Sequence, residues 1–192
     1  RQAAGVESHH YSARERQHRV ELFPRRTGFD EMPGRDVLAR FDQRLREMLD
    51  PQHTPAGSSC LILIDIDHFK KVNDNHGHLL GDRVLAALGE VLRTSVQALP
   101  GVSVARYGGE EFAVLLPGRS LDEATALAEV VRASAKGMKI KQRTSDKVLG
   151  TVTVSAGVAA LRSDDDEAAL IARADAALYR SKQEGRDRVT VG

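Results

Sequence analysis

The 192-residue sequence has one cysteine, no surplus of charge of either sign and no long apolar run. Cys60 has no second cysteine to pair with, which excludes a small scaffold stapled by disulfides. It stands at the head of the apolar run Leu61–Ile64, so we expect a buried strand residue in a reducing compartment rather than a reactive thiol. With 41% hydrophobic residues, the chain is also unlike a disordered tail.

The 28 Lys and Arg residues nearly balance the 27 Asp and Glu residues, and the net charge is +1. This balance gives no general reason to expect nucleic acid or an acidic membrane surface as a partner, so any phosphate binding must be local. No stretch approaches the roughly 18 consecutive apolar residues of a membrane span. The chain begins without an initiator Met or the apolar core of a signal peptide. We therefore expect a cytoplasmic piece of a longer protein, without membrane contact from this fragment.

Residues 1–33 are polar, rich in Arg and His, and interrupted by Pro and Gly, which predicts a linker or arm from an absent upstream region. Arg25 and Arg26 in this arm could serve a phosphate site or could simply be solvated. The remainder, 34–192, reads as one domain. Its first packed helix is predicted at 36–49, where apolar residues recur at helical spacing.

Strand and helix patterns then alternate along the domain. The expected elements are a strand at 59–65, a polar loop, a helix at 84–96, a strand at 102–107, a returning strand at 111–116, a helix from the Ser120/Glu123 capping box to about 138, a strand at 151–161, a helix at 164–182 and an edge strand at 189–191. Gly108 and Gly109 are expected to supply the positive φ of a tight turn. This split βαβ order predicts helices on one face of a mostly antiparallel sheet, with the hairpin beside the first strand at its centre.

Acidic residues stand at two points that this topology brings together. Asp65 lies where the first strand runs out into a loop, and burial there is costly unless the carboxylate holds a cation; the alternative is a solvated aspartate. Glu110 and Glu111 lie at the hairpin turn, where acids usually point into solvent. Beside Asp65 they would place three carboxylates within reach of one or two divalent cations. Oxygen ligands of this kind suit Mg²⁺ or Mn²⁺ and a nucleoside triphosphate.

Cationic residues stand near the same ends of the elements. Lys70 follows the first strand, and Lys182 and Arg186 flank the end of the last helix. They could bind the β- and γ-phosphates, together with the backbone N–H groups of the loop at His68 and Phe69. Basic residues at a helix C-terminus are also common for dipole reasons alone.

Polar residues bracket the loop that follows. Asn73 and Asp82 could match the edge of guanine, since a carboxylate accepts from its N1–H and 2-amino groups, or they could simply cap helices. His76 and His78 could form a transition-metal pair. We do not favour this, because no third histidine stands at ligand spacing.

Four separated motifs, in the same order and spacing, resemble the GGDEF domain of diguanylate cyclases. They are Asp65–Asp74, Gly77–Asp82, Arg106–Phe112 and Ala177–Arg186, and the resemblance covers about residues 34–192. It implies an α/β (α+β) fold with a split βαβ, palm-like core. In that fold a central, mostly antiparallel sheet is flanked by helices, as in the catalytic cores of class III nucleotide cyclases.

The resemblance also implies roles for residues. Asp65 and Glu110 would be side-chain metal ligands, Ile66 a ligand through its carbonyl, and Glu111 an aid to the metals or to deprotonation of the attacking hydroxyl. The substrate-binding residues would be those of the guanine and phosphate sites, namely Asn73, Asp82, Lys70, Phe69, His68, Lys182 and Arg186. The cofactor would be Mg²⁺ or Mn²⁺.

The reaction implied is condensation of two GTP into cyclic di-GMP and two pyrophosphates. A ribose 3′-OH would attack an α-phosphate with metal assistance. Each domain would hold one GTP, so turnover would need a homodimer, set in the family by an upstream sensor or coiled-coil region. The setting would be bacterial second-messenger signalling. The alternatives are a catalytically inactive module that senses GTP or a dinucleotide, and a purely structural dimerisation domain.

Two departures from the family pattern stand out. Members with product inhibition have an Arg-x-x-Asp motif before the glycine pair. In this sequence, Leu99 stands at the Arg position and Val102 at the Asp position. We therefore expect no high-affinity inhibitory site of that type. Near the start, where the family has a conserved segment lining the nucleotide site, Pro24–Met32 keeps only Thr27 and Gly28.

Overall fold

The computed structural model describes residues 34–50, 58–141 and 148–192. The elements, in chain order, are α1 (Gly34–Leu49), β1 (Ser59–Ile66), α2 (Phe69–His76), α3 (His78–Val96), β2 (Ser103–Arg106), β3 (Glu111–Pro117), α4 (Leu121–Gly137), β4 (Lys139–Lys141), β5 (Val148–Thr151), β6 (Val154–Ala160), α5 (Glu167–Gln183) and β7 (Val189–Val191). The predicted arm and the divergent Pro24–Met32 segment lie outside the described residues.

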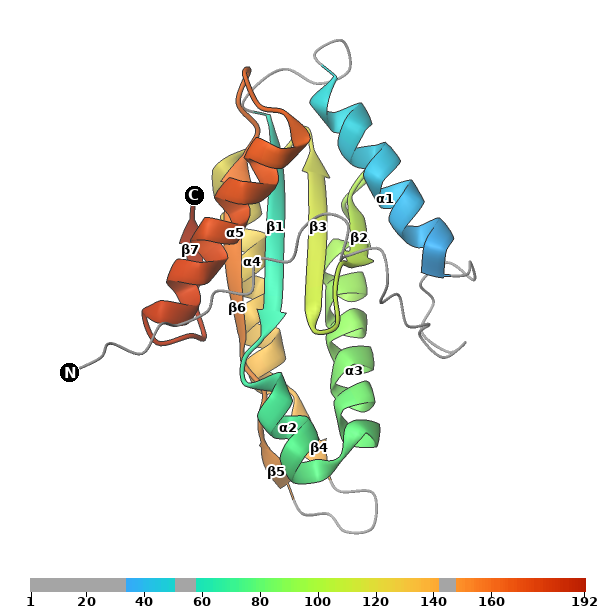
Figure 1. Cartoon of the computed structure of the whole chain (residues 1–192), viewed down its shortest axis with the longest axis vertical. Helices are drawn as coiled ribbons and strands as arrows, with labels where there is room; N and C mark the ends of the chain where they lie inside the picture. Colours follow the sequence, from blue (N-terminus) through green and yellow to red (C-terminus); the bar gives the residue numbers. More distant parts are fainter. Residues whose placement is uncertain (1–33, 51–57, 142–147) are drawn as a thin grey trace, which may run out of the picture.

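The main sheet has five strands in the order β2-β3-β1-β6-β7, with β1 at its centre (Figure 1). All neighbours pair antiparallel except β6 and β7, which are parallel. The predicted mostly antiparallel sheet is therefore confirmed, as is the hairpin beside the first strand. A separate small sheet pairs β4 with β5.

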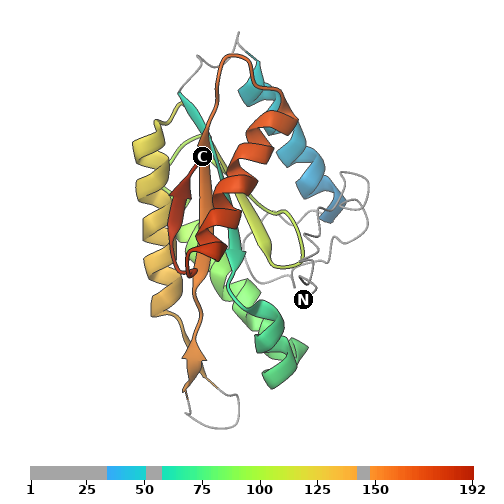
Figure 2. The ribbon, with the colours of Figure 1, turned by 60° about the vertical axis from the view of Figure 1, so that its left-hand side comes forward.

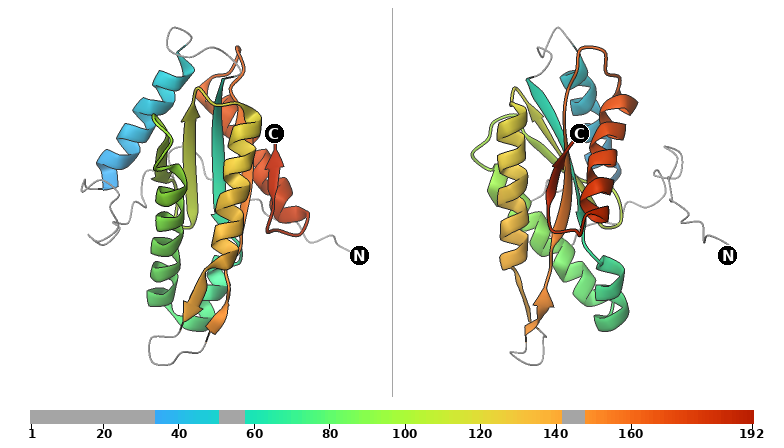
Figure 3. Two further views of the ribbon diagram at one scale, coloured as in Figure 1. Left: turned by 180° about the vertical axis from the view of Figure 1, so that it is seen from behind. Right: turned by 90° about the vertical axis from the view of Figure 1, so that its left-hand side faces the viewer.

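Helices cover both faces of this sheet, so the prediction that they lie on one face is wrong. One cluster joins Ile62 and Ile64 of β1 to side chains of α3 and α4, and a second joins Leu61 and Leu63 to side chains of α1 and α5. Figures 2 and 3 show the sheet between these two pairs of helices. Every residue of β1 is buried, and its unbroken apolar run is the pattern of a strand covered on both faces.

Local signals fix the starts of two helices. Ser120 and Glu123 form the predicted capping box at the start of α4, with hydrogen bonds in both directions between side chain and backbone. Asp166 caps α5 by accepting a hydrogen bond from the backbone N–H of Ala169. Cys60 is fully buried as expected, and burial, followed by the charge of Glu123, raises the pKa of its thiol to about 11.

Three other expectations need correction. The polar stretch after β1 is not a loop, because it forms α2 and the first turns of α3. The strand predicted at 151–161 is two strands, β5 and β6, which belong to different sheets. Neither Gly108 nor Gly109 has positive φ. In the described part of the chain, no helix is long and apolar enough to cross a membrane.

Candidate active site

The end of β1 and the turn between β2 and β3 form one acidic corner of the sheet (Figure 1). Asp65 pairs in register with Glu111 across β1 and β3. The backbone N–H of Ile66 donates a hydrogen bond to the carbonyl of Glu110 at 3.3 Å. Register alone thus brings Asp65, Glu110 and Glu111 to the same corner, as the sequence predicted.

The hairpin turn is held by its own backbone and by one arginine. The N–H groups of Tyr107 and Gly108 both donate to the carbonyl of Glu111, and the Arg106 guanidinium donates to the carbonyls of Gly108 and Gly109. A Cβ on Gly108 would lie 2.6 Å from Oε2 of Glu111. A side chain at this position would thus displace the flexible end of Glu111, and Gly108 does not have the positive φ that would itself require glycine. No role for Arg106 was predicted from the sequence.

Asp65 is buried, with 4% of its surface exposed, and its Oδ2 lies 2.8 Å from Nζ of Lys182. Burial raises the pKa of Asp65 in spite of Lys182, which lowers it, and the nearby charge of Asp67 raises it further. Burial, followed by the charges of Asp65 and Glu111, raises the pKa of Glu110 to about 6. The corner therefore has more negative charge than Lys182 neutralises.

This charge surplus and the oxygen donors fit a hard divalent cation. The side chains of Asp65 and Glu110 and the carbonyl of Ile66 are the candidate ligands. Within residues 34–50, 58–141 and 148–192, no three His, Cys, Asp or Glu side chains stand together as a metal-binding group. The three acids share a corner, but Lys182 and not a third carboxylate contacts Asp65. The ligand roles of Asp65, Ile66, Glu110 and Glu111 stay predictions.

The predicted phosphate-binding cations come from two elements beside this corner. Lys182, in the last turn of α5, contacts Asp65, and the charge of Arg186 lowers the pKa of Asp65 after burial and Lys182. Lys70 is exposed on the first turn of α2, which begins at Phe69. The first N–H groups of a helix have no acceptor within the helix, which suits an anion.

The residue between these groups, Asp67, was not predicted to have a side-chain role. Its backbone N–H donates to the carbonyl of Thr153 at 2.9 Å, and so does not serve a phosphate cradle. His68, the next residue, has a left-handed backbone with φ 58° and starts α2. The predicted cradle is thus confined to the backbone of His68, Phe69 and Lys70.

The predicted base-reading residues lie on the α2–α3 pair. The Oδ1 atom of Asn73 is buried and has no hydrogen-bond partner. It lies 2.0 Å from where a Cβ on Gly81 would be. Asp82 is exposed on the first turns of α3. Gly77 is the cap between the two helices and no side chain caps α3, so the capping alternative for Asn73 and Asp82 is wrong.

The remaining sequence candidates behave as ordinary structure. His76 ends α2 and His78 begins α3, and no metal-binding group includes them among the described residues. Leu99 and Val102 are partly buried and pack against the larger core cluster. The place of the inhibitory motif is therefore occupied by apolar packing.

Comparison with known proteins agrees with this geometry. A family model described as diguanylate cyclase, GGDEF domain, matches residues 30–188. Diguanylate cyclase VdcA of Vibrio cholerae is 45% identical over 129 residues, which cover 67% of this chain and 38% of that protein. This chain thus spans about two fifths of that relative's length.

Solved structures are similar over most of the chain. The GGDEF domain of DgcB from Caulobacter crescentus, in complex with c-di-GMP, matches with a TM-score of 0.73 and 37% identity, covering 80% of this chain and 88% of that one. An active GGEEF domain of a diguanylate cyclase from Vibrio cholerae matches with a TM-score of 0.63 and 32% identity, covering 81% of this chain and 89% of that one. The fold is therefore the palm-like fold of nucleotide cyclases, and the chain belongs to the GGDEF domain family of diguanylate cyclases.

Proposed function

We propose that this chain is an active diguanylate cyclase domain that condenses two GTP into cyclic di-GMP and two pyrophosphates. The observation that supports this most is the acidic corner, where Asp65 and Glu110 interact electrostatically and Glu110 has a pKa raised to about 6 by burial and by Asp65. A buried charge surplus of this kind has no packing purpose, which disfavours a purely structural dimerisation domain. The turn Gly108–Phe112 that forms the corner is intact, which disfavours an inactive sensor.

In this proposal Asp65, Glu110 and the Ile66 carbonyl hold Mg²⁺ or Mn²⁺, and Glu111 assists the metals or the removal of the 3′-OH proton. The metal would supply charge neutralisation at the α-phosphate and a more acidic 3′-OH. In the structure, the ammonium group of Lys182 partly neutralises the negative charge of Asp65. This ammonium group becomes available to a triphosphate oxygen once a cation balances the carboxylates.

Substrate recognition is assigned to the two groups of residues beside the corner. Lys70, Lys182 and Arg186 bind the triphosphate together with the backbone of His68 and Phe69. Asn73 and Asp82 read guanine. The buried, partnerless Oδ1 of Asn73 supports this assignment, because a buried acceptor is costly unless a ligand donates to it.

Turnover is expected to need two copies of the domain. The product has two 3′,5′ links, and one site holds one GTP, so each copy must supply the electrophile for the other's nucleophile. We infer a homodimer, arranged by an upstream sensor or coiled-coil region of the longer protein, in the bacterial cytoplasm. A monomer is expected to be nearly inactive.

The test is incubation of the chain with GTP and Mg²⁺, with ATP as the matched control and the products separated by chromatography. Cyclic di-GMP with pyrophosphate supports the proposal. Binding of GTP without turnover, measured under conditions in which the chain is dimeric, contradicts it in favour of a sensor module. Size measurement with and without a GTP analogue establishes the dimeric state.

A further inference from the structure

The carboxylate of Asp67 is buried, with 6% of the residue exposed, and it accepts hydrogen bonds from two segments that are distant in the sequence. Its Oδ1 accepts from the Ser155 hydroxyl at 2.7 Å, and its Oδ2 accepts from the Thr153 hydroxyl at 2.7 Å. Oδ2 also accepts from the backbone N–H of Asp187 at 3.0 Å. A carboxylate with three short hydrogen bonds is suited to fixing its neighbours in place.

Asp67 joins segments whose backbones are strained. In the described part of the chain, the non-glycine residues with left-handed backbones are His68, Arg186 and Asp187, with φ of 58°, 64° and 46°. A left-handed backbone is unfavourable for a residue with a side chain and persists only where its surroundings hold it. His68 follows Asp67 directly, and Asp187 donates to its carboxylate. Asp67 thus holds both strained segments.

These two segments are the ones that present the predicted phosphate-binding groups. His68 precedes the first turn of α2, and Arg186 immediately precedes the residue whose N–H Asp67 binds. Arg186 is close enough to the corner for its charge to act on Asp65. Its own N–H donates to the carbonyl of Ser181 at 2.9 Å, which closes the end of α5.

A second anchor fixes the same loop from α4. The carboxylate of Asp187 contacts Arg132 at 2.8 Å and Lys136 at 2.6 Å, both from α4. The loop is therefore held from two sides, by the buried Asp67 through its backbone and by the half-exposed cations of α4 through its side chain. Of the two contacts, the one to Asp67 lies on the side of the acidic corner.

We propose that Asp67 is a positioning residue for the triphosphate: its buried carboxylate holds the loop after α5 so that Arg186 faces the acidic corner. This inference rests on the proposed function for the identity of the nucleotide. The proposal gives Asp67 no direct contact with phosphate or metal, because its carboxylate accepts three hydrogen bonds from within the protein. If Asp67 had a purely structural role, its substitution would lower stability, and it would change nucleotide affinity by the same factor with or without the Arg186 side chain.

The test is a double-mutant cycle between Asp67 and Arg186, read as the affinity for α,β-methylene-GTP with Mg²⁺ by calorimetry. Asp67→Asn keeps the shape but removes the negative charge and replaces one of the two acceptor oxygens by an NH2 group, so the hydrogen bond from the Asp187 N–H is weakened or lost. Losing a charge-assisted contact to phosphate should weaken binding roughly tenfold to a hundredfold. In an Arg186→Ala background the same change should cost only about twofold or less, because the group that it positions is gone.

Asp165→Asn is the matched control. Asp165 is another buried carboxylate that anchors a loop at the opposite end of α5, through Arg173 and the Arg162 N–H. It should lower the melting temperature without changing nucleotide affinity. Should Asp67→Asn fold poorly, Asp187→Asn tests the second anchor. Asparagine tolerates a left-handed backbone, and the variant loses only the contacts to Arg132 and Lys136, so binding should weaken about fivefold.

The inference is supported if Asp67→Asn strongly weakens binding of the analogue in the native background and weakens it little in the Arg186→Ala background. Equal losses in both backgrounds, or an unchanged affinity in the native background, overturn it. If the native chain binds the analogue with this coupling but makes no cyclic di-GMP as a dimer, the proposed function fails and the positioning role stands. If it binds no GTP analogue, both fail.

Discussion

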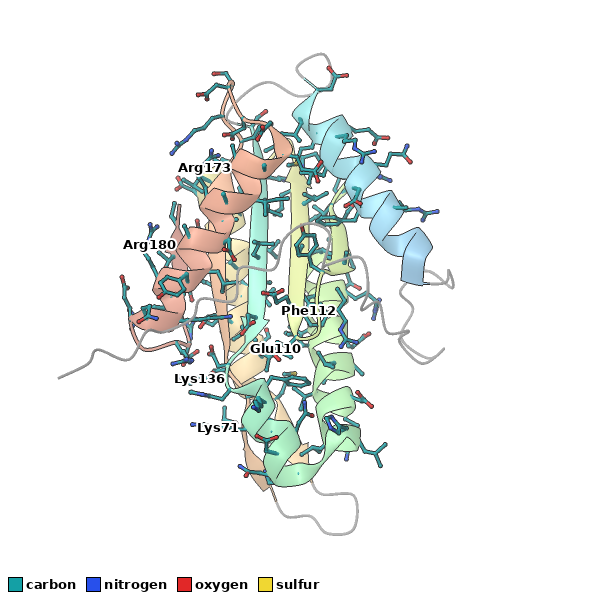
Figure 4. All side chains as sticks on the ribbon, viewed as in Figure 1. Lys71, Glu110, Phe112, Lys136, Arg173 and Arg180 are labelled. Carbon is teal, nitrogen blue, oxygen red and sulfur yellow. The ribbon has the colours of Figure 1, made fainter. Side chains whose placement is uncertain are left out.

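Each end of α5 has an ion pair between a buried carboxylate and a partly exposed cation, but the two pairs lie in opposite electrostatic settings. At the N-terminal end, Arg173 donates hydrogen bonds to both carboxylate oxygens of Asp165, and this contact lowers the pKa of Asp165 despite burial. At the C-terminal end, Lys182 faces Asp65, whose pKa burial raises all the same. Figure 4 shows Arg173 near the top of the view and Glu110 well below it, close to the middle of the molecule.

This contrast separates a structural ion pair from the ion pair at the proposed active site. The first end has its charges matched within the protein and should contribute stability. The second end retains a surplus of carboxylate charge that a divalent cation would balance. Substitutions at the two ends should therefore affect different properties of the protein.

The largest effect is expected from Glu110→Gln. It removes a candidate metal ligand, and turnover should fall at least about a hundredfold. Because Asp65 and Glu111 repel Glu110, the melting temperature should stay the same or rise. Cyclic di-GMP formation and thermal unfolding measure the two properties. A clear drop in melting temperature would make Glu110 a structural residue and end the contrast.

Asp165→Asn should do the reverse. It leaves Arg173 without its carboxylate and weakens the hydrogen bond to the Arg162 N–H, so the free energy of unfolding should fall by about 1–3 kcal/mol. Activity per folded molecule should stay near that of the native chain. Denaturant unfolding and turnover in the same buffer provide the comparison, and loss of turnover without loss of stability would contradict it.

Gly81→Ala should separate the base site from the acidic corner. The new Cβ would lie 2.0 Å from Oδ1 of Asn73, so that side chain must rotate away. The Cβ would also lie 3.1 Å from Cζ of the buried Phe69, which must shift slightly, so stability should fall modestly, while affinity for GTP should fall about tenfold. Calorimetry with a GTP analogue tests this. Unchanged affinity would remove Asn73 from the base site.

The pH dependence of stability should have opposite signs at the two ends. Glu110 has a folded pKa of about 6 against an ordinary 4.5, so its contribution to stability is present below pH 4.5 and is lost as pH rises to about 6. Asp165 has a lowered pKa, so its contribution is present above its ordinary pKa of 3.8 and is lost as pH falls through the lowered value.

The Glu110 effect is isolated by measuring the free energy of unfolding of the native chain and of Glu110→Gln at each pH, without metal, and taking the difference. The difference should change by about 1–2 kcal/mol, allowing for solvent screening, across the window from 4.5 to about 6. A flat difference would mean that Glu110 lies in an ordinary solvated setting.

The smallest effect is expected from the product. Leu99 and Val102 pack against the core at the two positions where the sequence comparison expected an Arg-x-x-Asp motif, so we expect no separate inhibitory site of that type. Added cyclic di-GMP should slow the reaction only near the concentrations at which GTP itself binds. Inhibition far below the substrate concentration would contradict this and would reveal a charged binding surface elsewhere.

The sequence predicted the acidic corner because its determinants are local. The sequence shows an apolar strand that reaches Asp65 and a Gly-Gly turn just before Glu110 and Glu111. The predicted order of strands then places this turn beside the end of the first strand. Placement of helices on both faces was missed, although the unbroken apolar run of β1 is itself the signal of a doubly covered strand. The helix α2 was missed because Phe69 is its one buried residue, which leaves no apolar period to detect.

Long-range contacts were beyond prediction from the sequence. Lys182 was expected to face phosphates, but its contact with Asp65 depends on how α5 docks against the sheet. Asp67 was seen as part of a motif, yet its role depends on Thr153, Ser155 and Asp187, which only the fold brings to it. The metal-ligand and base-reading roles stay predictions.

Manganese titration followed by electron paramagnetic resonance tests the central claim most directly, since a bound Mn²⁺ ion loses the signal of the free ion. With α,β-methylene-GTP present, the native chain should bind Mn²⁺, and both Asp65→Asn and Glu110→Gln should bind it at least about tenfold more weakly, whereas Asp165→Asn should match the native chain. Native-like Mn²⁺ binding by Asp65→Asn and Glu110→Gln would show that these carboxylates share no cation.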